Sequence, residues 1–213
     1  MQRELKPELL DSLQPDDPAA LHNRRDLRLI NRVQGNHRWL MRTLAERWRP
    51  GEPILEIGAG TGELAGRLSA RGKPTDGLDL WPVPSDWPPD RRWHQADLMS
   101  FDGYADYPVL IGNLIFHQFE AGQLAELGQR LRRSARLILA CEPMRRRSSQ
   151  VLYRALGPLL GANYVSLHDA HASIAAGFRV GELANLLGLA EPAWAWRCHS
   201  TVLGTVRMVA WRL

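Results

Sequence analysis

The chain has few cysteines and no long apolar run. Its 213 residues include only two cysteines, Cys141 and Cys198, which are too few for a disulfide framework and are interpreted as reduced core thiols. No group of cysteines and histidines has the spacing of a zinc site, so we expect no metal. The longest apolar stretches, at 109–111 and 137–141, are far shorter than the ~20 residues of a membrane-spanning helix.

The N-terminal segment also lacks the apolar core of a secretory signal, so we expect a cytoplasmic protein. There are no internal repeats and no low-complexity tracts, and the length suits one sizeable core. Charged residues make up 23% and hydrophobic residues 45%, proportions that are ordinary for a soluble globular protein. The net charge of +4 permits a nucleic-acid partner without requiring one.

Residues 19–48 have a helical pattern that breaks at Gly35. In its first half, the residues expected to form an apolar face are Leu27, Leu29, Ile30 and Val33. We interpret residues 1–50 as an N-terminal helical cap that belongs to the same domain as the remaining residues, 51–213.

The remaining residues alternate between strand-like and helix-like segments. This order predicts a mainly parallel sheet that is covered on both faces. Residues 193–213 differ, because two β-rich runs are divided near Gly204 and predict an antiparallel hairpin at the sheet edge. The other strands are expected at 53–57, 75–80, 92–95, 107–112 and 135–141, with helices at 63–70 and 122–133.

A glycine turn follows the first of these strands and opens a helix. Gly58, Gly60 and Gly62 come after Glu56 in the stretch ILEIGAGTGEL, and backbone N–H groups in such a turn approach a ligand closely. A dinucleotide fold would need a glycine where Glu63 stands, and a pyrophosphate would be repelled by that carboxylate. No lysine follows the glycines, so a P-loop is also excluded. A phosphate-free cation such as S-adenosylmethionine suits the turn.

This stretch resembles the first motif of the class I S-adenosylmethionine-dependent methyltransferases. The resemblance implies an α/β, Rossmann-like fold: a mainly parallel seven-stranded sheet with a C-terminal antiparallel hairpin and an N-terminal helical cap. It also implies S-adenosylmethionine as the cofactor, S-adenosylhomocysteine as the product, and no metal.

Acidic residues after the next strands support the resemblance. In this family an acid in the place of Asp79 accepts both ribose hydroxyls, although Asp76 competes for that assignment. Asp97 would bind the adenine amino group, Leu98 would flank the ring and Trp81 would stack on it. The predicted cofactor-binding set is Glu56, Gly58, Ala59, Gly60, Gly62, Asp79, Leu80, Trp81, Asp97, Leu98 and Asn113.

The fourth strand ends in a segment that resembles the N-L-x-x-H-H-F region of small-molecule methyltransferases. Asn113, Leu114, His117 and Phe119 match it, whereas Gln118 replaces the second histidine. The N-P-P-[YF] pattern of enzymes that methylate base amino groups is missing. A small-molecule acceptor is therefore favoured over a nucleobase.

Methyl transfer to a hydroxyl requires alignment, exclusion of water and removal of a proton. The candidate catalytic residues are His168, Asp169 and His117, with Asp169 able to orient an imidazole. His168, Asp169 and Ser173 also resemble the H-D-x-x-x-S segment of small bacterial methyltransferases. A capping or surface role for His168, and a role for His117 as a satisfied pocket-wall side chain, are the competing interpretations.

Residues 130–154 contain eight arginines and a single acid, Glu142. A solvated surface is the simplest interpretation, while Arg145, Arg146 and Arg147 would lie nearer the active-site rim and receive an anionic substrate or an RNA backbone. Two roles are expected for Glu142: it contacts the substrate, or it neutralises the neighbouring arginines. We hypothesise methylation of a hydroxyl or carboxyl oxygen on a phenolic, polyketide or lipid-like acceptor; the alternatives are an RNA or protein methyltransferase and a non-catalytic partner with this fold.

Overall fold

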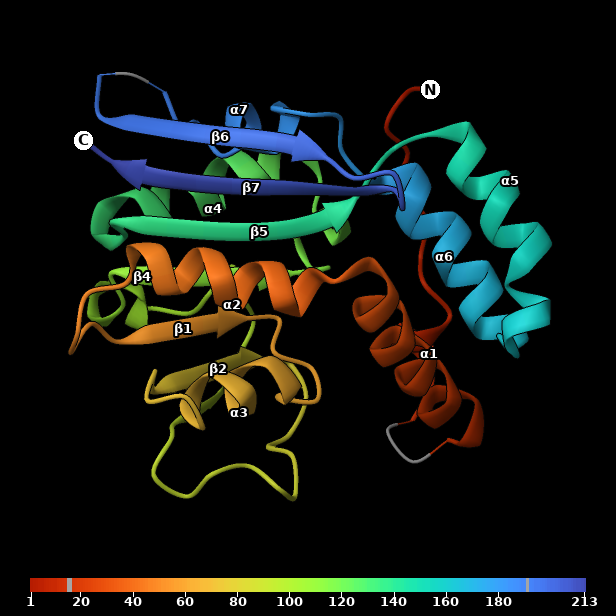
Figure 1. Ribbon diagram of the computed structural model, residues 1–213, viewed down its shortest axis with the longest axis horizontal. Helices are drawn as coiled ribbons and strands as arrows, with labels where there is room; N and C mark the ends of the chain where they lie inside the picture. Colours follow the sequence, from red (N-terminus) through yellow and green to blue (C-terminus); the bar gives the residue numbers. More distant parts are fainter. Residues whose placement is uncertain (15–16, 191) are drawn as a thin grey trace.

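The computed structural model describes residues 1–14, 17–190 and 192–213 and contains one seven-stranded sheet with helices on both faces (Figure 1). The strands are β1 (Ile54–Ile57), β2 (Thr75–Asp79), β3 (Trp93–Gln95), β4 (Val109–Asn113), β5 (Leu137–Pro143), β6 (Trp194–Ser200) and β7 (Thr205–Arg212). The α-helices are α1 (Pro18–Gln34), α2 (Asn36–Arg47), α3 (Glu63–Ser69), α4 (Ala121–Ser134), α5 (Arg147–Leu156), α6 (Tyr164–Ala176) and α7 (Glu182–Leu186). Short 3-10 turns are η1 (Leu10–Ser12), η2 (Gly103–Asp106), η3 (Phe116–Gln118) and η4 (Pro158–Leu160).

The strand order is β3-β2-β1-β4-β5-β7-β6. The first five strands pair in parallel, whereas β7 pairs antiparallel with both β5 and β6, which confirms the expected sheet and its terminal hairpin. Chain order reverses between β1 and β4, where Ile57 lies opposite Gly112. In open α/β sheets such a switch point forms the ligand crevice at the carboxyl ends of the strands.

The apolar strands bury both sheet faces. On one face α2 and α3 contribute a cluster that includes Leu40, Leu44 and Leu64. On the other face α4 and α7 contribute a second cluster, with Leu127 and Leu183 among its members. The second half of the expected cap, α2, is therefore part of the layer that covers the sheet, as Figure 1 shows.

The first half, α1, leaves the sheet at Gly35, whose φ of 66° confirms the predicted break. It packs on α6, which also contacts α5, and the three helices stand together beside the sheet in Figure 1. The expected apolar face does not pack into the core: Ile30 is partly buried, but Leu27, Leu29 and Val33 are 36%, 38% and 57% exposed. The buried face of α1 is polar instead. None of the described helices is long and apolar enough to cross a membrane.

Candidate cofactor and acceptor site

The glycine turn between β1 and α3 leaves room for a ligand at one position. Gly58, Gly60 and Gly62 have φ values of 67°, 55° and 69°. A methyl group added at Gly58 would lie 2.5 Å from Ile115, whereas one added at Gly60 would have no atom within 4 Å. Gly58 is therefore needed for packing, and Gly60 borders open space.

Glu56 lies beneath this turn and is 4% exposed. Its Oε2 accepts a hydrogen bond of 2.9 Å from the backbone N–H of Ala65, in the first turn of α3. Burial raises the pKa of Glu56 to about 8, and the nearby carboxylates of Asp79 and Glu63 also raise it. The hydrogen bond from Ala65 lowers this pKa but does not offset the other effects. The carboxyl group is thus largely protonated at neutral pH, and a cation bound nearby would lower its pKa.

Asp79 ends β2 and connects the turn to the next loop. Its Oδ2 accepts a hydrogen bond from Gly60 N at 2.7 Å, and its Oδ1 accepts one from Trp81 N at 3.0 Å. Each carboxylate oxygen has a second lone pair, so both oxygens keep acceptor capacity. Trp81 lies beneath the guanidinium of Arg24 from α1, at 4.5 Å from the ring centroid. The cap helix therefore reaches over this part of the site.

The remaining adenine-side predictions lie after β3. Asp97 is exposed and its Oδ1 accepts a hydrogen bond of 2.6 Å from Met99 N. Leu98 is 4% exposed and belongs to the core, while Leu80 is 63% exposed. Asp97 thus stands at the same sheet edge as Asp79, but Leu80 points largely to solvent.

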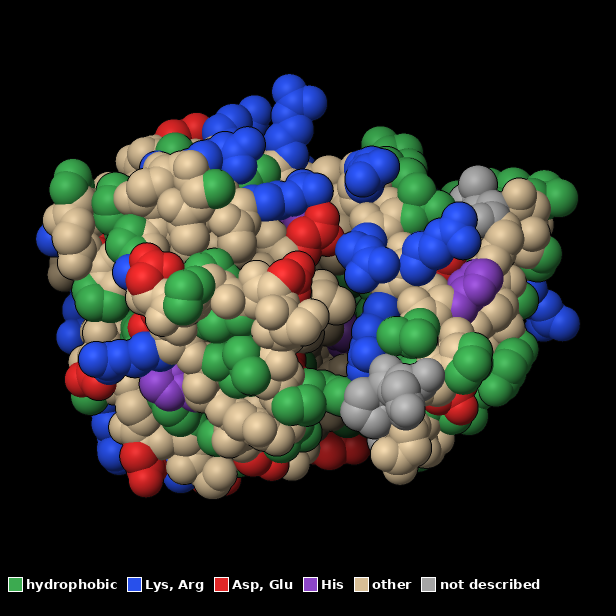
Figure 2. Space-filling view, turned by 90° about the horizontal axis from the view of Figure 1, so that it is seen from below, with side chains coloured by type: hydrophobic (Ala, Val, Ile, Leu, Met, Phe, Trp, Pro, Cys, Tyr) green, Lys and Arg blue, Asp and Glu red, His purple; other side chains and the backbone are tan. Residues whose placement is uncertain are grey.

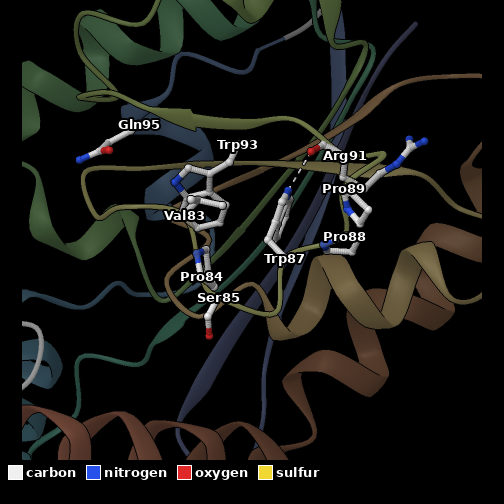
Figure 3. A pocket seen from close by; sticks show the side chains of 9 residues that line it. All are labelled: Val83, Pro84, Ser85, Trp87, Pro88, Pro89, Arg91, Trp93 and Gln95. Atoms are coloured by element: carbon white, nitrogen blue, oxygen red, sulfur yellow. Dashed lines mark hydrogen bonds between the residues drawn. The ribbon is translucent and has the colours of Figure 1, made fainter.

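The loop between β2 and β3 contains a cavity of about 570 Å³ (Figure 3). Trp87 and Trp93 meet edge to face there, with ring centroids 4.8 Å apart. Trp87 donates to Arg91 O at 2.9 Å and lies against Gly62, where an added methyl group would approach it to 2.6 Å. These tryptophans support the glycine turn from the sheet edge.

Asn113 ends β4 at the switch point. Its Nδ2 donates to Asn31 Oδ1 at 3.0 Å, and Asn36 Nδ2 donates to the same oxygen at 3.3 Å. Among the described residues, the Oδ1 atoms of Asn113 and Asn36 are buried and have no hydrogen-bond partner. Leu114 follows with a φ of 60°, a strained conformation for a residue with a side chain. Two buried acceptor oxygens near the end of β4 are therefore unpaired.

His117 lies between two carboxylates. Its Nδ1 is 2.7 Å from Glu142 Oε2 and its Nε2 is 3.3 Å from Glu8 Oε1. Burial lowers the pKa of His117, but the hydrogen bonds and charges of Glu142 and Glu8 outweigh this and raise it to about 10. The ring is an imidazolium at neutral pH, with both N–H groups engaged.

Glu142 also fixes the segment that follows β4. Its two oxygens accept hydrogen bonds from the backbone N–H groups of Ile115, Phe116 and His117, at 2.9, 2.9 and 3.2 Å. Glu142 thus neutralises His117, an outcome that neither sequence interpretation of this residue anticipated. Arg145 is buried and pairs with Glu182 at 2.9 Å, so its guanidinium is already engaged and is not free to receive an anionic substrate.

Asp169 on α6 binds the N-terminal segment. Its oxygens accept hydrogen bonds from Leu9 N at 2.7 Å and Leu10 N at 3.1 Å. His168 Nδ1 is 3.1 Å from Asp169 Oδ1, and the His168 side chain is 47% exposed. Ser173 donates to Glu8. The three residues of the H-D-x-x-x-S match therefore contact one another or the N-terminal segment.

Beneath this segment lies a cavity of about 250 Å³. Its lining comes from the N-terminal segment, η3 and α6: Leu5, Lys6, Pro7, Glu8, His117, Gln118, Ala172 and Ala176. Figure 2 shows the surface hollowed between the sheet body and the three helices beside it, with basic side chains along the hollow. The structure thus brings His117 and Glu8 to this cavity. Asp169, Ser173 and Glu142 do not line it; they hydrogen-bond the N-terminal segment, Glu8 and His117, respectively. Sequence analysis did not single out Glu8.

No family model and no curated protein matches the chain. Among solved structures it is similar to the plantazolicin methyltransferase BamL in complex with a triazolic desmethylPZN analogue and SAH (TM-score 0.73, 10% identity, 95% of this chain and 92% of that chain). It is also similar to the plantazolicin methyltransferase BpumL in complex with SAH (0.70, 12%, 92% and 91%) and to the methyltransferase domain of bacterial CtHen1 (0.58, 12%, 85% and 99%). The chain therefore has the class I methyltransferase fold, which confirms the fold expected from the resemblance.

Proposed function

We propose that the chain is an S-adenosylmethionine-dependent methyltransferase that methylates a hydroxyl or carboxyl oxygen of a small phenolic, polyketide or lipid-like acceptor. The observation that carries the proposal is the carboxylate-backed glycine turn at the switch point of this fold. The carboxylates of Asp79 and Glu63 act on the carboxyl group of Glu56 beneath the turn, so this negatively charged surrounding disfavours a pyrophosphate and favours a cation.

The residues present fit the cofactor. When bound, S-adenosylmethionine supplies a methyl group that the positive sulfur already activates. Asp79 has the spare lone pairs to accept ribose hydroxyls, and Asp97 would accept a hydrogen bond from the adenine amino group. The unpartnered Oδ1 of Asn113 is suited to the cofactor's ammonium group, and open space at Gly60 admits close approach of the ligand.

For the acceptor, we assign different roles to the two histidines. With Nδ1 donating to Asp169, His168 keeps a lone pair on Nε2, which would remove the hydroxyl proton. His117 is already charged and fully bonded, so it positions Glu8 and Glu142 and does not take a proton. The N-terminal segment, which Asp169 holds on α6, lines the cavity and would exclude water from it.

The test is transfer of a labelled methyl group from S-adenosylmethionine to a panel of alkylphenols and fatty or aromatic acids. His168→Gln should lower turnover of a hydroxyl acceptor at neutral pH by 10² to 10⁴, the usual range for general-base catalysis. A carboxylate acceptor is already ionised and should be unaffected by this change. Binding of S-adenosylhomocysteine with no transfer to any acceptor class would contradict the catalytic proposal.

A further inference from the structure

The three-helix lobe formed by α1, α5 and α6 has an unusual distribution of polarity. It is held together by polar contacts: Ser166 Oγ donates to Asp26 Oδ2 at 2.6 Å, Asn163 Nδ2 donates to Ala19 O at 3.0 Å, and Gly161 O is 2.9 Å from His22 Nε2. The buried residues of α1 are Ala20, Asn23 and Asp26. Its leucines therefore point outward.

Helix α5 has the same character, because none of its residues is buried. Of sixteen large hydrophobic side chains that are exposed in the described residues, eleven lie on the lobe or on the β6–β7 turn beside it. They are Leu21, Leu27, Leu29, Val33, Val151, Leu152, Leu156, Leu159, Tyr164, Val202 and Leu203, and the remaining five are Leu80, Val83, Val180, Trp196 and Leu213. Such a concentration marks an interaction surface.

The β6–β7 turn connects the apolar ends of α1 and α5. Gln34, at the end of α1, donates to Leu203 O at 3.2 Å. Ser149, near the start of α5, lies so close to Gly204 that an added methyl group would be 2.9 Å from its hydroxyl. Val202 in this turn is 96% exposed. The apolar residues of the two helices and the turn therefore adjoin at this end of the lobe.

The same surface is strongly basic. Residues 143–168 contain no acid. In the part of the chain that the structure describes, no ion pair joins an acidic side chain to the lobe arginines Arg25, Arg28, Arg32, Arg146, Arg147 and Arg154. Figure 2 shows basic and hydrophobic side chains intermixed over the right-hand part of the molecule, where these helices lie, with few acidic ones.

We propose that this lobe docks on an anionic lipid surface, where its aliphatic side chains enter the interface and its arginines bind the headgroups. A second copy of the chain would present the same positive charge and be repelled. Aliphatic side chains that project this far, such as Leu159 at 81% exposure, suit a fluid interface better than the fixed shape of a protein or an RNA. This inference rests on the proposed function and deepens it, because a lipid surface is where a lipid-like acceptor would be found.

The experiment is sedimentation of the full chain with vesicles of phosphatidylcholine, alone or mixed equally with phosphatidylglycerol. We expect binding to the mixed vesicles only. Replacing Arg146, Arg147 and Arg154 by Gln should lower the vesicle partition coefficient by about a hundredfold. The same replacement of Arg38, Arg42 and Arg71, which are exposed outside the lobe, is the charge-matched control and should change it far less.

The apolar contribution is tested with Val151→Gln and Leu159→Gln together, which should weaken binding to mixed vesicles by about tenfold or more. Val180→Gln with Leu213→Gln is the matched control, since these side chains are 49% and 71% exposed elsewhere. The proposal is overturned if the mixed vesicles do not bind, or if lobe and control variants behave alike. It is also overturned if the lobe variants abolish dimerisation instead, or if RNA binds more tightly and only the arginine variant weakens it.

Calorimetry with S-adenosylhomocysteine on the same variants separates this inference from the proposed function. The lobe variants should keep the wild-type affinity. Loss of vesicle binding with intact affinity supports docking, whereas vesicle binding by a chain that does not bind S-adenosylhomocysteine would count against the methyltransferase proposal alone.

Discussion

Replacing Glu56 by Gln should stabilise the protein at alkaline pH. The amide keeps an acceptor oxygen for Ala65 N–H but removes a carboxyl group whose pKa burial raises from 4.5 to about 8. Between these two values the unfolded chain loses the proton while the folded chain retains it. Folding stability conferred by this group is therefore complete below pH 4.5 and is lost as the pH rises through about 8.

The size of the effect follows from the shift. A difference of this size corresponds to an upper limit of about 5 kcal/mol in the free energy of unfolding. Urea unfolding, followed by tryptophan fluorescence across this pH range, should show the difference between Glu56→Gln and wild type growing from acid to alkaline pH. Glu46→Gln, at an exposed position, is the control and should leave the wild-type profile unchanged.

The same group should respond to the cofactor. At pH 7 a carboxyl group with a pKa of about 8 is roughly nine-tenths protonated. A cationic ligand at the turn lowers that pKa, so binding of S-adenosylmethionine should release up to one proton, measured by calorimetry in buffers of different ionisation enthalpy. Parallel unfolding profiles for the two chains, or equal proton release by Glu56→Gln, would refute the reasoning.

Three further outcomes test the site. Glu142→Gln should lower the free energy of unfolding, measured in urea, by about 3–5 kcal/mol, because it breaks a buried pair with His117. It should also weaken the loss of stability that accompanies a rise in pH from 6.5 through about 10, the pKa of His117. An unchanged pH profile would contradict the pairing. Asp169→Ala should release the N-terminal segment, seen as faster amide exchange at residues 9 and 10, and unchanged exchange there would contradict the anchoring. Gly60→Ala and Gly72→Ala should each cost about 1–2 kcal/mol of stability, since both have positive φ and open space, but only Gly60→Ala should weaken S-adenosylhomocysteine binding; equal affinities would remove Gly60 from the site.

The parts of the fold that the sequence predicts are those set by local pattern. The apolar run at 137–141 predicts most of strand β5, and the glycine turn is encoded by neighbouring residues. The break at Gly35 likewise depends on one residue with a left-handed conformation. These features need no knowledge of distant partners, so composition and spacing suffice to place them.

The rest depends on contacts between distant segments. Glu8 lies 109 residues from His117, and no local pattern pairs them. The orientation of α1 is decided by Asp26 and Asn23, which find partners on α6 and so turn Leu27 outward. Sequence analysis assigned no element to 147–156, although Val151, Leu152 and Leu156 recur there at the spacing of an amphipathic helix.

The most direct test of the account is calorimetric titration of the full chain with S-adenosylhomocysteine, alongside Asp79→Ala. The wild-type chain should bind one ligand per chain, and the variant should bind at least about tenfold more weakly because hydrogen bonds to a charged acceptor are lost. No heat of binding at millimolar ligand, or equal affinity for the two chains, would contradict the central claim that the carboxylate-backed turn holds this nucleoside.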